Sequence, residues 1–388
     1  MMEALKKIIL GDACVTNANS YSLKEEWKFV NYLDTGNITD NIIESIQYID
    51  TKVEQLPSRA RRKVKNGSIV YSTVRPNQRH FGIIKTQPEN FLVSTGFAVI
   101  DVDADVLDAD FLYYLLTQPT LVEALHAIAE QSTSAYPSIK PSDIENLEIM
   151  VPELATQKKI ADILGSLDRK IAKNNAINDN LQQQAKALYQ QMFIDNPVPG
   201  GYIGTLSDIA DITMGQSPNG SSYNEDGNGT VFFQGRAEFG FRFPSVRLYT
   251  TEPKRMAYAN DTLMSVRAPV GDLNVAYTDC CIGRGLAAIH SKSNKQSFVL
   301  YTMFSLRKQL DVFNGEGTVF GSINRTSLNE LPIFIPSDRE IVNFETIVAP
   351  IDAAIRNNYE EICRLEKIRD TLLPKLMSGE LDVSAVEL

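Results

Sequence analysis

The residues of this chain best suited to chemistry are cations and amides of the kind that contact nucleic acid. Between Gln55 and Pro88 there is no Asp or Glu. The same stretch holds a basic run followed by a second polar group: Arg59, Arg61, Arg62, Lys63 and Lys65, then Arg75, Asn77, Gln78, Arg79 and His80. Arg, Asn and Gln can bond base edges, whereas Lys mostly neutralises phosphates. The stretch predicts a nucleic-acid contact, with a merely solvated face as the alternative.

A second set of candidates is interleaved with aromatic residues. It comprises Gln234, Arg236, Arg242 and Arg247, among Phe233, Phe239, Phe241 and Phe243. We expect these aromatic rings in a core more often than at a contact. Arg75 and Arg267 lie in the similar strings STVRP (72–76) and SVRAP (265–269), so we expect them at equivalent places. There they could serve either as DNA contacts or as partners in structural ion pairs.

Signatures of catalysis are missing from the sequence. There is no GxxxxGK(S/T) phosphate loop, no GxGxxG, no HExxH, no GxSxG and no Asn- or Asp-Pro-Pro-aromatic string. The three histidines are too scattered for a zinc site, and the four cysteines include no CxxC, which suits reduced thiols in a cytoplasm. We therefore expect no catalytic residue and no metal. The alternatives are a stand-alone DNA-modifying enzyme with an unrecognised site and a two-domain scaffold that binds protein only.

Composition is that of a globular protein, with 43% hydrophobic residues and a net charge of −10. No apolar run approaches the roughly 18 residues of a membrane span, and the first residues are too polar for a secretory signal. We expect a cytoplasmic protein without membrane contact. The negative net charge means that any surface for nucleic acid must be a local patch.

An internal repeat organises the chain. Residues 132–193 match residues 316–377 without a gap, at a spacing of 184, with pairs such as Ser138 and Ser322 or Asp168 and Asp352. Upstream, VSTGFAVI (93–100) resembles IGRGLAAI (282–289) and FLYYLL (111–116) resembles FVLYTM (298–303). The repeat predicts a tandem duplication in which each globular part is followed by a helical segment.

Both helical segments carry apolar residues at alternating spacings of four and three. The predicted seam comprises Leu167, Ile171, Asn174, Asn178, Leu181, Leu188, Ile351, Ile355, Asn358, Ile362, Leu365 and Leu372. This spacing is typical of coiled coils, although a helix docked on its own domain is the alternative. Gly165-Ser166 and Ala349-Pro350 should break or kink the helices, and Pro374 should end or bend the second one early. About 27 residues remain after each break, roughly 40 Å of helix or about twelve base pairs of DNA.

The fold class expected from these patterns is α+β, with two globular domains that are each followed by a long helix. Strand-like strings such as LEIMVP (147–152) and LPIFIP (331–336) precede each long helix, and shorter helices are expected near 108–130 and 295–312. The expected parts are a first domain over 1–151, a helical spacer over 152–195, a second domain over 196–335, and a distal spacer with a tail over 336–388.

The order of these parts resembles the specificity (S) subunit of type I restriction–modification systems over essentially the whole chain. Family-like strings open the two globular parts (LGDACVTN, LSDIADITMGQSP) and recur within them (SIVYSTVRP, DTLMSVRAP). The family often has a Glu-Gln pair after the shared proline; here Thr156-Gln157 keeps half of it, and Glu340-Ile341 loses the Gln.

That resemblance implies a division of labour. Each globular part would be a target-recognition domain that reads one half of a split double-stranded DNA sequence. The helices would pack antiparallel and dock methyltransferase (M) subunits, two in number, with restriction (R) subunits joining through the complex. The chain itself would bind no cofactor, and S-adenosylmethionine would sit on the methyltransferase.

Overall fold

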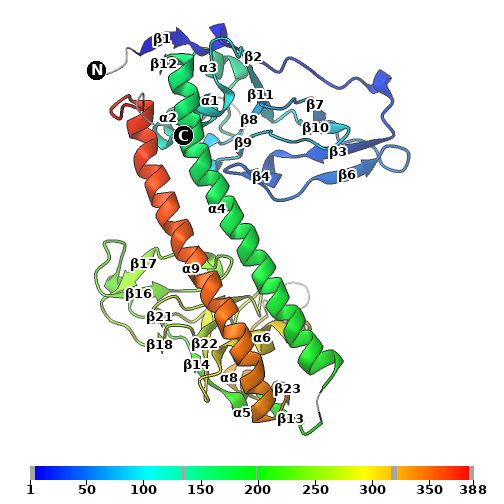
Figure 1. Cartoon of the computed structure of the whole chain (residues 1–388), viewed down its shortest axis with the longest axis vertical. Coiled ribbons are helices and arrows are strands. Elements are labelled where there is room, and N and C mark those ends of the chain that lie inside the picture. Colours follow the sequence, from blue (N-terminus) through cyan, green and yellow to red (C-terminus); the bar gives the residue numbers. More distant parts are fainter. Residues whose placement is uncertain (1–4, 133–135, 198, 316–320, 384–388) are drawn as a thin grey trace. The chain divides into compact units, whose positions relative to one another are not determined.

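The computed structural model describes residues 5–132, 136–197, 199–315 and 321–383, and mixes helices with strands as predicted. The chain forms two compact units. Unit 1 contains Met1–Lys173 and Glu361–Leu388, and unit 2 contains Asn174–Glu360. Two long helices, α4 (Leu154–Tyr189) and α9 (Asp338–Met377), each contribute to both units (Figure 1).

Unit 1 begins with a strand pair and then builds two four-stranded sheets (Figure 1). The pair is β1 (Lys6–Ile9) with β12 (Glu148–Val151), antiparallel. The first sheet has the order β2 (Cys14–Thr16), β11 (Phe97–Val102), β8 (Ile69–Ser72), β9 (Phe81–Ile83). The second has the order β6 (Gln47–Asp50), β3 (Phe29–Leu33), β10 (Phe91–Ser94), β7 (Ala60–Arg62). A small hairpin joins β4 (Ile38–Thr39) to β5 (Ile42–Ile43).

The core of unit 1 lies between the first sheet and its helices, α1 (Ala109–Leu116), α2 (Pro119–Glu130) and α3 (Pro141–Glu145). Tyr71 and Ile100 from the sheet pack with Phe111 and Leu125 from the helices, and all four side chains are buried. The strands read as short apolar runs because both faces are covered, as in the FAVIDV of β11.

Unit 2 repeats this plan. β13 (Tyr202–Thr205) pairs antiparallel with β23 (Pro332–Ile335). One sheet has the order β14 (Ala210–Met214), β22 (Leu286–Ser291), β19 (Thr262–Ser265), β20 (Leu273–Val275). The other has the order β15 (Tyr223–Asn224), β17 (Leu248–Thr250), β16 (Thr230–Phe233), β21 (Cys280–Ile282), β18 (Met256–Ala257). Its helices include α6 (Gln296–Ser305), α7 (Arg307–Asp311) and α8 (Arg325–Asn329).

Backbone hydrogen bonds give the residue-by-residue correspondence between the units. Ile139 N–H donates to the Thr73 carbonyl, and Ile323 N–H donates to the Val266 carbonyl. Thr73 therefore corresponds to Val266, so Val74 corresponds to Arg267 and Arg75 to Ala268. The expectation that Arg75 and Arg267 are equivalent was wrong by one position. It aligned the Val-Arg pairs of STVRP and SVRAP, whereas the backbone aligns the two strings from their first residues.

The expected helix breaks do not occur. Helix α4 runs through Gly165-Ser166 for 36 residues, and α9 runs through Pro350 and Pro374 for 40 residues. At 1.5 Å per residue these helices are roughly 54 and 60 Å long, so the estimate of 40 Å was too short. Packing overrides the local propensity here, because Leu164 and Val348 next to the expected breaks are fully buried in the two cores.

The seam residues are all buried or half-buried in the structure. In unit 2 the amide of Asn358 donates to the side-chain oxygen of Asn178 at 2.8 Å, and Tyr189 packs on Phe344 with ring centroids 5.6 Å apart. These two contacts show that the α4 and α9 segments of unit 2 run antiparallel. In unit 1 Arg369 of α9 pairs with Asp168 of α4 at 2.9 Å.

Hydrogen bonds tie one helix of each globular part, α1 or α6, to the long helix that follows it. The Tyr114 hydroxyl of α1 donates to Asp168 at 2.6 Å, and the Tyr301 hydroxyl of α6 donates to Asp352 at 2.9 Å. These two tyrosine–aspartate bonds occupy matching places in the repeat. Burial raises the pKa of both tyrosines, so their hydroxyls stay protonated donors at neutral pH.

A second set of hydrogen bonds explains why the family's Gln is present as Gln157 in the first repeat and replaced by Ile341 in the second. The Gln157 side chain is 1% exposed, accepts from the Asp108 N–H at 2.9 Å and donates to two backbone carbonyls. At the matching place in unit 2 stands Ile341, and Glu345, one turn later, accepts from the N–H groups of Ser297 and Phe298. Burial raises the pKa of the Glu345 carboxyl even though both backbone groups donate to it. The starts of α1 and α6 are thus secured by different side chains.

We predict that Gln157→Ala lowers the free energy of unfolding by about 2 kcal/mol, because it leaves buried backbone groups without partners. Urea denaturation followed by circular dichroism measures this loss. The matched control is Gln183→Ala on the exposed face of the same helix, which should change stability by less than about 0.5 kcal/mol. Equal effects of the two substitutions would contradict the tie.

Candidate nucleic-acid interface

Four loops of unit 2 meet at one edge, which we call the four-loop edge. It comprises residues 215–217 after β14, 234–236 after β16, 266–268 after β19 and 283–285 between β21 and β22. Gly283 N–H donates to the Phe233 carbonyl, Val266 N–H to the Gly285 carbonyl, and Arg284 N–H to the Ser217 hydroxyl. The loops therefore hold one another through their backbones.

Glycine makes this close approach of the loops possible. A Cβ added at Gly215 would lie 2.1 Å from the carbonyl oxygen of Gly283, and one added at Gly283 would lie 2.8 Å from the Cα of Gln234. No larger residue fits at either place without moving backbone. The glycines at 283 and 285 therefore shape the edge.

A polar hollow of about 270 Å³ opens between the loops. Its polar lining comprises Ser217, Gln234, Arg236, Ser265, Arg267 and Arg284. Three residues predicted from the sequence, Gln234, Arg236 and Arg267, are thus brought together. Arg284 was not predicted. Its string, IGRG, matches VSTG of the first repeat, and the glycine that the two strings share says nothing about the arginine before it.

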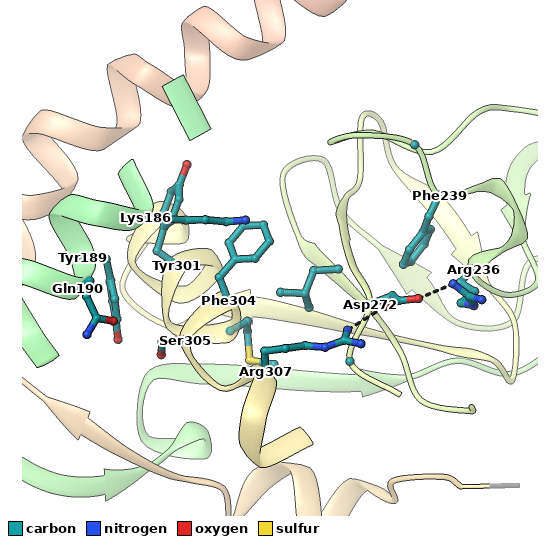
Figure 2. Close-up of a pocket in the computed structure, with 14 residues that line it drawn as sticks. Lys186, Tyr189, Gln190, Arg236, Phe239, Asp272, Tyr301, Phe304, Ser305 and Arg307 are labelled. Carbon is teal, nitrogen blue, oxygen red and sulfur yellow. Dashed lines mark hydrogen bonds and ion pairs between the residues drawn. The ribbon is translucent and has the colours of Figure 1, made fainter. Parts of the chain in front are cut away.

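Arg236 also borders a larger neighbouring hollow of about 590 Å³ in unit 2 (Figure 2). There Asp272 lies between two cations and binds Arg236 at 2.5 Å and Arg307 at 2.8 Å. Across the hollow the ammonium of Lys186 lies 3.9 Å from the Phe304 ring centroid, and burial lowers the pKa of Lys186. Arg236 is therefore accessible, but a carboxylate already compensates much of its charge.

Arg242 is a correction to the predicted set. Its side chain is 4% exposed, binds Asp352 at 3.3 Å and donates to the Tyr301 hydroxyl at 2.9 Å. A residue buried in this way cannot reach DNA, so Arg242 joins the globular part to α9. Arg247 is 58% exposed but binds Glu238 at 2.8 Å. Phe233 and Phe243 are buried, as expected for core aromatics, whereas Phe241 is exposed.

The basic run of unit 1 lies on and beside β7, the edge strand of the second sheet. Arg59 is exposed just before the strand, while Arg61 and Arg62 are half-buried. Burial lowers the pKa of the Arg62 guanidinium. Lys63 binds Glu25 and lies 5.1 Å from the Trp27 ring centroid, and the exposed Lys65 lies 4.0 Å from Asp101. The run itself contains no acidic residue, but acidic side chains from other parts of unit 1 lie beside it.

The second polar group of unit 1 surrounds the short helix η4 (Pro76–Gln78). Asn77 and Gln78 are exposed. Arg75 is exposed and lies 5.3 Å from the Tyr136 ring centroid. Arg79 binds Asp40 at 2.7 Å, and the His80 ring contacts the Ile38 carbonyl at 2.7 Å. Arg75, Asn77 and Gln78 are thus the most accessible of the group.

The matching edges of the two units carry different side chains. In the parallel strand pairs, Leu33 lies opposite Val93 in unit 1 and Phe233 lies opposite Ile282 in unit 2. Asp34 therefore corresponds to Gln234 and Thr95 to Arg284, just as Val74 corresponds to Arg267. Arg59 and Arg75 supply cations near this edge in unit 1, since the Thr95 N–H donates to the Arg59 carbonyl. The framework is shared, and the groups it presents are not.

Comparison with known proteins identifies the family. Residues 5–183 match the model of the type I restriction modification DNA specificity domain. A chain that carries the name of the MjaX type I restriction enzyme specificity subunit, from Methanocaldococcus jannaschii, is 30% identical over 365 residues, covering 88% of this chain and 84% of the relative. The HindI specificity subunit of Haemophilus influenzae is 24% identical over 90% of this chain and 94% of its own. This chain belongs to the type I restriction enzyme specificity subunits.

The fold agrees with that membership. The S subunit of a type I restriction–modification system from M. genitalium is similar with a TM-score of 0.61 at 17% identity, over 96% of each chain. The family suggested by the order of the parts and by the short strings is therefore confirmed. Specificity subunits are the non-catalytic component of type I restriction systems.

Within 5–132, 136–197, 199–315 and 321–383, no group of three His, Cys, Asp or Glu side chains is placed to hold a metal ion. Over the same ranges, no helix combines the length and apolar character needed to cross a membrane.

We predict that Arg242→Met lowers the free energy of unfolding by about 3 kcal/mol, because it strips Asp352 of its buried cation. Thermal or urea unfolding measures the loss. Lys7→Met is the matched control, since it removes an ion pair with Glu148 that is exposed at both ends and should cost less than about 0.5 kcal/mol. A stable Arg242→Met protein that binds DNA more weakly would return Arg242 to the interface and contradict the assignment.

Proposed function

We propose that this specificity subunit reads a two-part DNA sequence, with the globular part of each unit recognising one half-site. The observation that carries the proposal is the shared framework with unshared side chains. Both units bring the same strands and loops to one edge, yet the residues presented there differ at every compared position. One framework with two side-chain sets suits a protein that reads two different sequences in related poses.

The proposed contacts follow the accessible groups. In unit 2 they are Gln234, Arg236, Arg267 and Arg284 of the four-loop edge, with Arg247 nearby in sequence. In unit 1 they are Arg59, Arg75, Asn77, Gln78 and Arg79, with Arg61, Arg62, Lys63 and Lys65 of the basic run. Because the whole chain has a net charge of −10, attraction to phosphates must come from these local groups.

The long helices are proposed to dock the catalytic partners. In each helix the seam residues are buried or half-buried, and many residues between them are exposed and remain available for a partner. Two methyltransferase subunits fit a chain with an internal repeat, because each repeat offers one equivalent helical surface. S-adenosylmethionine would then bind to the methyltransferase, restriction subunits would join through the complex, and the assembly would act on DNA in the cytoplasm.

The decisive experiment combines this chain with the methyltransferase of its own system and S-adenosylmethionine. Sequencing of methylated DNA should reveal one split recognition sequence, while the chain alone should methylate nothing. The methyltransferase without this chain is the matched control and should show no such sequence. Methylation by the isolated chain, or methylation without sequence preference by the complex, would overturn the proposal.

A further inference from the structure

We propose that Arg267 and Arg284 are the guanine-reading residues of unit 2, so that the half-site recognised by this unit contains guanine at the positions they reach. The inference rests on the proposed function and goes further, since it assigns a base to a side chain. Arg267 and Arg284 line the polar hollow of the four-loop edge and, unlike Arg236 beside them, bind no acidic residue among the described residues of the chain.

Most nearby arginines are already committed to carboxylates. Arg236 and Arg307 share Asp272, Arg247 binds Glu238, and Arg242 binds Asp352. Arg267 and Arg284, by contrast, are exposed and form no ion pair with an acidic residue in the part of unit 2 that the structure describes. Two uncommitted guanidinium groups on one polar hollow are donors that still need an acceptor.

The backbone beneath these arginines is held in place. Ala268 N–H donates to the Gly321 carbonyl, and the Ser265 hydroxyl donates to the Pro269 carbonyl while accepting from Asp272 N–H. Arg284 sits between two glycines whose backbone bonds to Phe233 and Gln234 fix the turn. Side chains presented from fixed loops lose less conformational freedom on binding, which favours specific contacts over diffuse attraction.

Guanine is the base whose groove edge best matches a free guanidinium. Its O6 and N7 are two adjacent acceptors, and arginine can bond both at once. Gln234 lies on the same hollow and can bond the N6 and N7 of adenine through its amide. The edge therefore combines two donors suited to guanine with one group suited to adenine.

Unit 1 lacks these groups at the matching positions. Val74 corresponds to Arg267 and Thr95 to Arg284, and neither can donate a pair of hydrogen bonds from its side chain. Guanine reading from these two positions therefore belongs to the half-site of unit 2 alone. The difference also gives the test an internal control, because the other half-site should keep its preferences.

The test uses the full-length chain in complex with its methyltransferase, with methylated sequences selected from a random DNA library. Arg267→Gln and Arg284→Gln should each lower the preference for guanine at one position of one half-site by about tenfold or more, in favour of adenine. The other half-site should be unchanged. Arg307→Gln, which removes an exposed arginine of unit 2 already bound to Asp272, is the matched control and should leave every base preference intact.

Three results would overturn the assignment. A native half-site for unit 2 without guanine would do so, as would variants that keep the native base preferences. The third result is uniformly weaker methylation of all sequences, together with a slope of log affinity against log salt concentration that is smaller by about 0.9 for each variant. It would show that the arginines contact phosphates instead of bases. In each case the wild-type complex still methylates a split sequence, whereas failure of the proposed function would remove that sequence altogether. Unchanged unfolding temperatures of the variants exclude loss of fold as the cause.

Discussion

The structure depends on one carboxylate in each repeat, Asp168 in α4 and Asp352 in α9. Each accepts a hydrogen bond from a tyrosine hydroxyl of the preceding globular part, Tyr114 of α1 or Tyr301 of α6, and each also binds an arginine. In unit 1 the arginine is Arg369 from the opposite long helix, whereas in unit 2 it is Arg242 from the globular part itself. The edge proposed to read DNA can be aimed only if its domain is fixed to its helix, and these partly buried charge-assisted bonds supply that fixation.

The second constraint is the antiparallel seam and its polar members. Asn358 bonds Asn178 inside the interface between the long helices, which favours one register over its neighbours at some cost in stability. The spacing of 184 residues between repeats makes Asn174 the counterpart of Asn358, Ala185 the counterpart of Arg369 and Ile177 the counterpart of Glu361. Two copies of the first repeat would therefore place Asn178 against Asn174 in both directions and lose the Asp168–Arg369 and Lys170–Glu361 ion pairs. The seam of this chain is thus compatible with a symmetric assembly of its own first half.

Sequence alone could predict the parts of this fold that repeat and the parts that follow a period. The fold class, the strands before each long helix and the seam positions followed from local patterns and spacing, because periodic burial leaves a periodic pattern. The family rested instead on a resemblance in the order of the parts and in short strings. The burial of Arg242 and the uncommitted state of Arg284 could not be predicted, since both depend on which distant carboxylate lies within reach. The helix breaks expected at Gly165 and Pro350 were wrong for a related reason: burial of Leu164 and Val348 outweighs local propensity. Sequence thus identified three residues that meet at the four-loop edge, Gln234, Arg236 and Arg267, but could not show which cations there lack a carboxylate partner.

Each repeat is proposed to carry one complete reading unit on one helix, so that the recognised sequence is the sum of two independent halves. The most direct measurement is the methylated sequence of a complex built on a chain that contains residues 1–195 twice in tandem. We expect an inverted repeat of one native half-site, the one read by unit 1, at a fixed spacing. Retention of the native asymmetric sequence by this complex, or methylation without sequence preference, would contradict it.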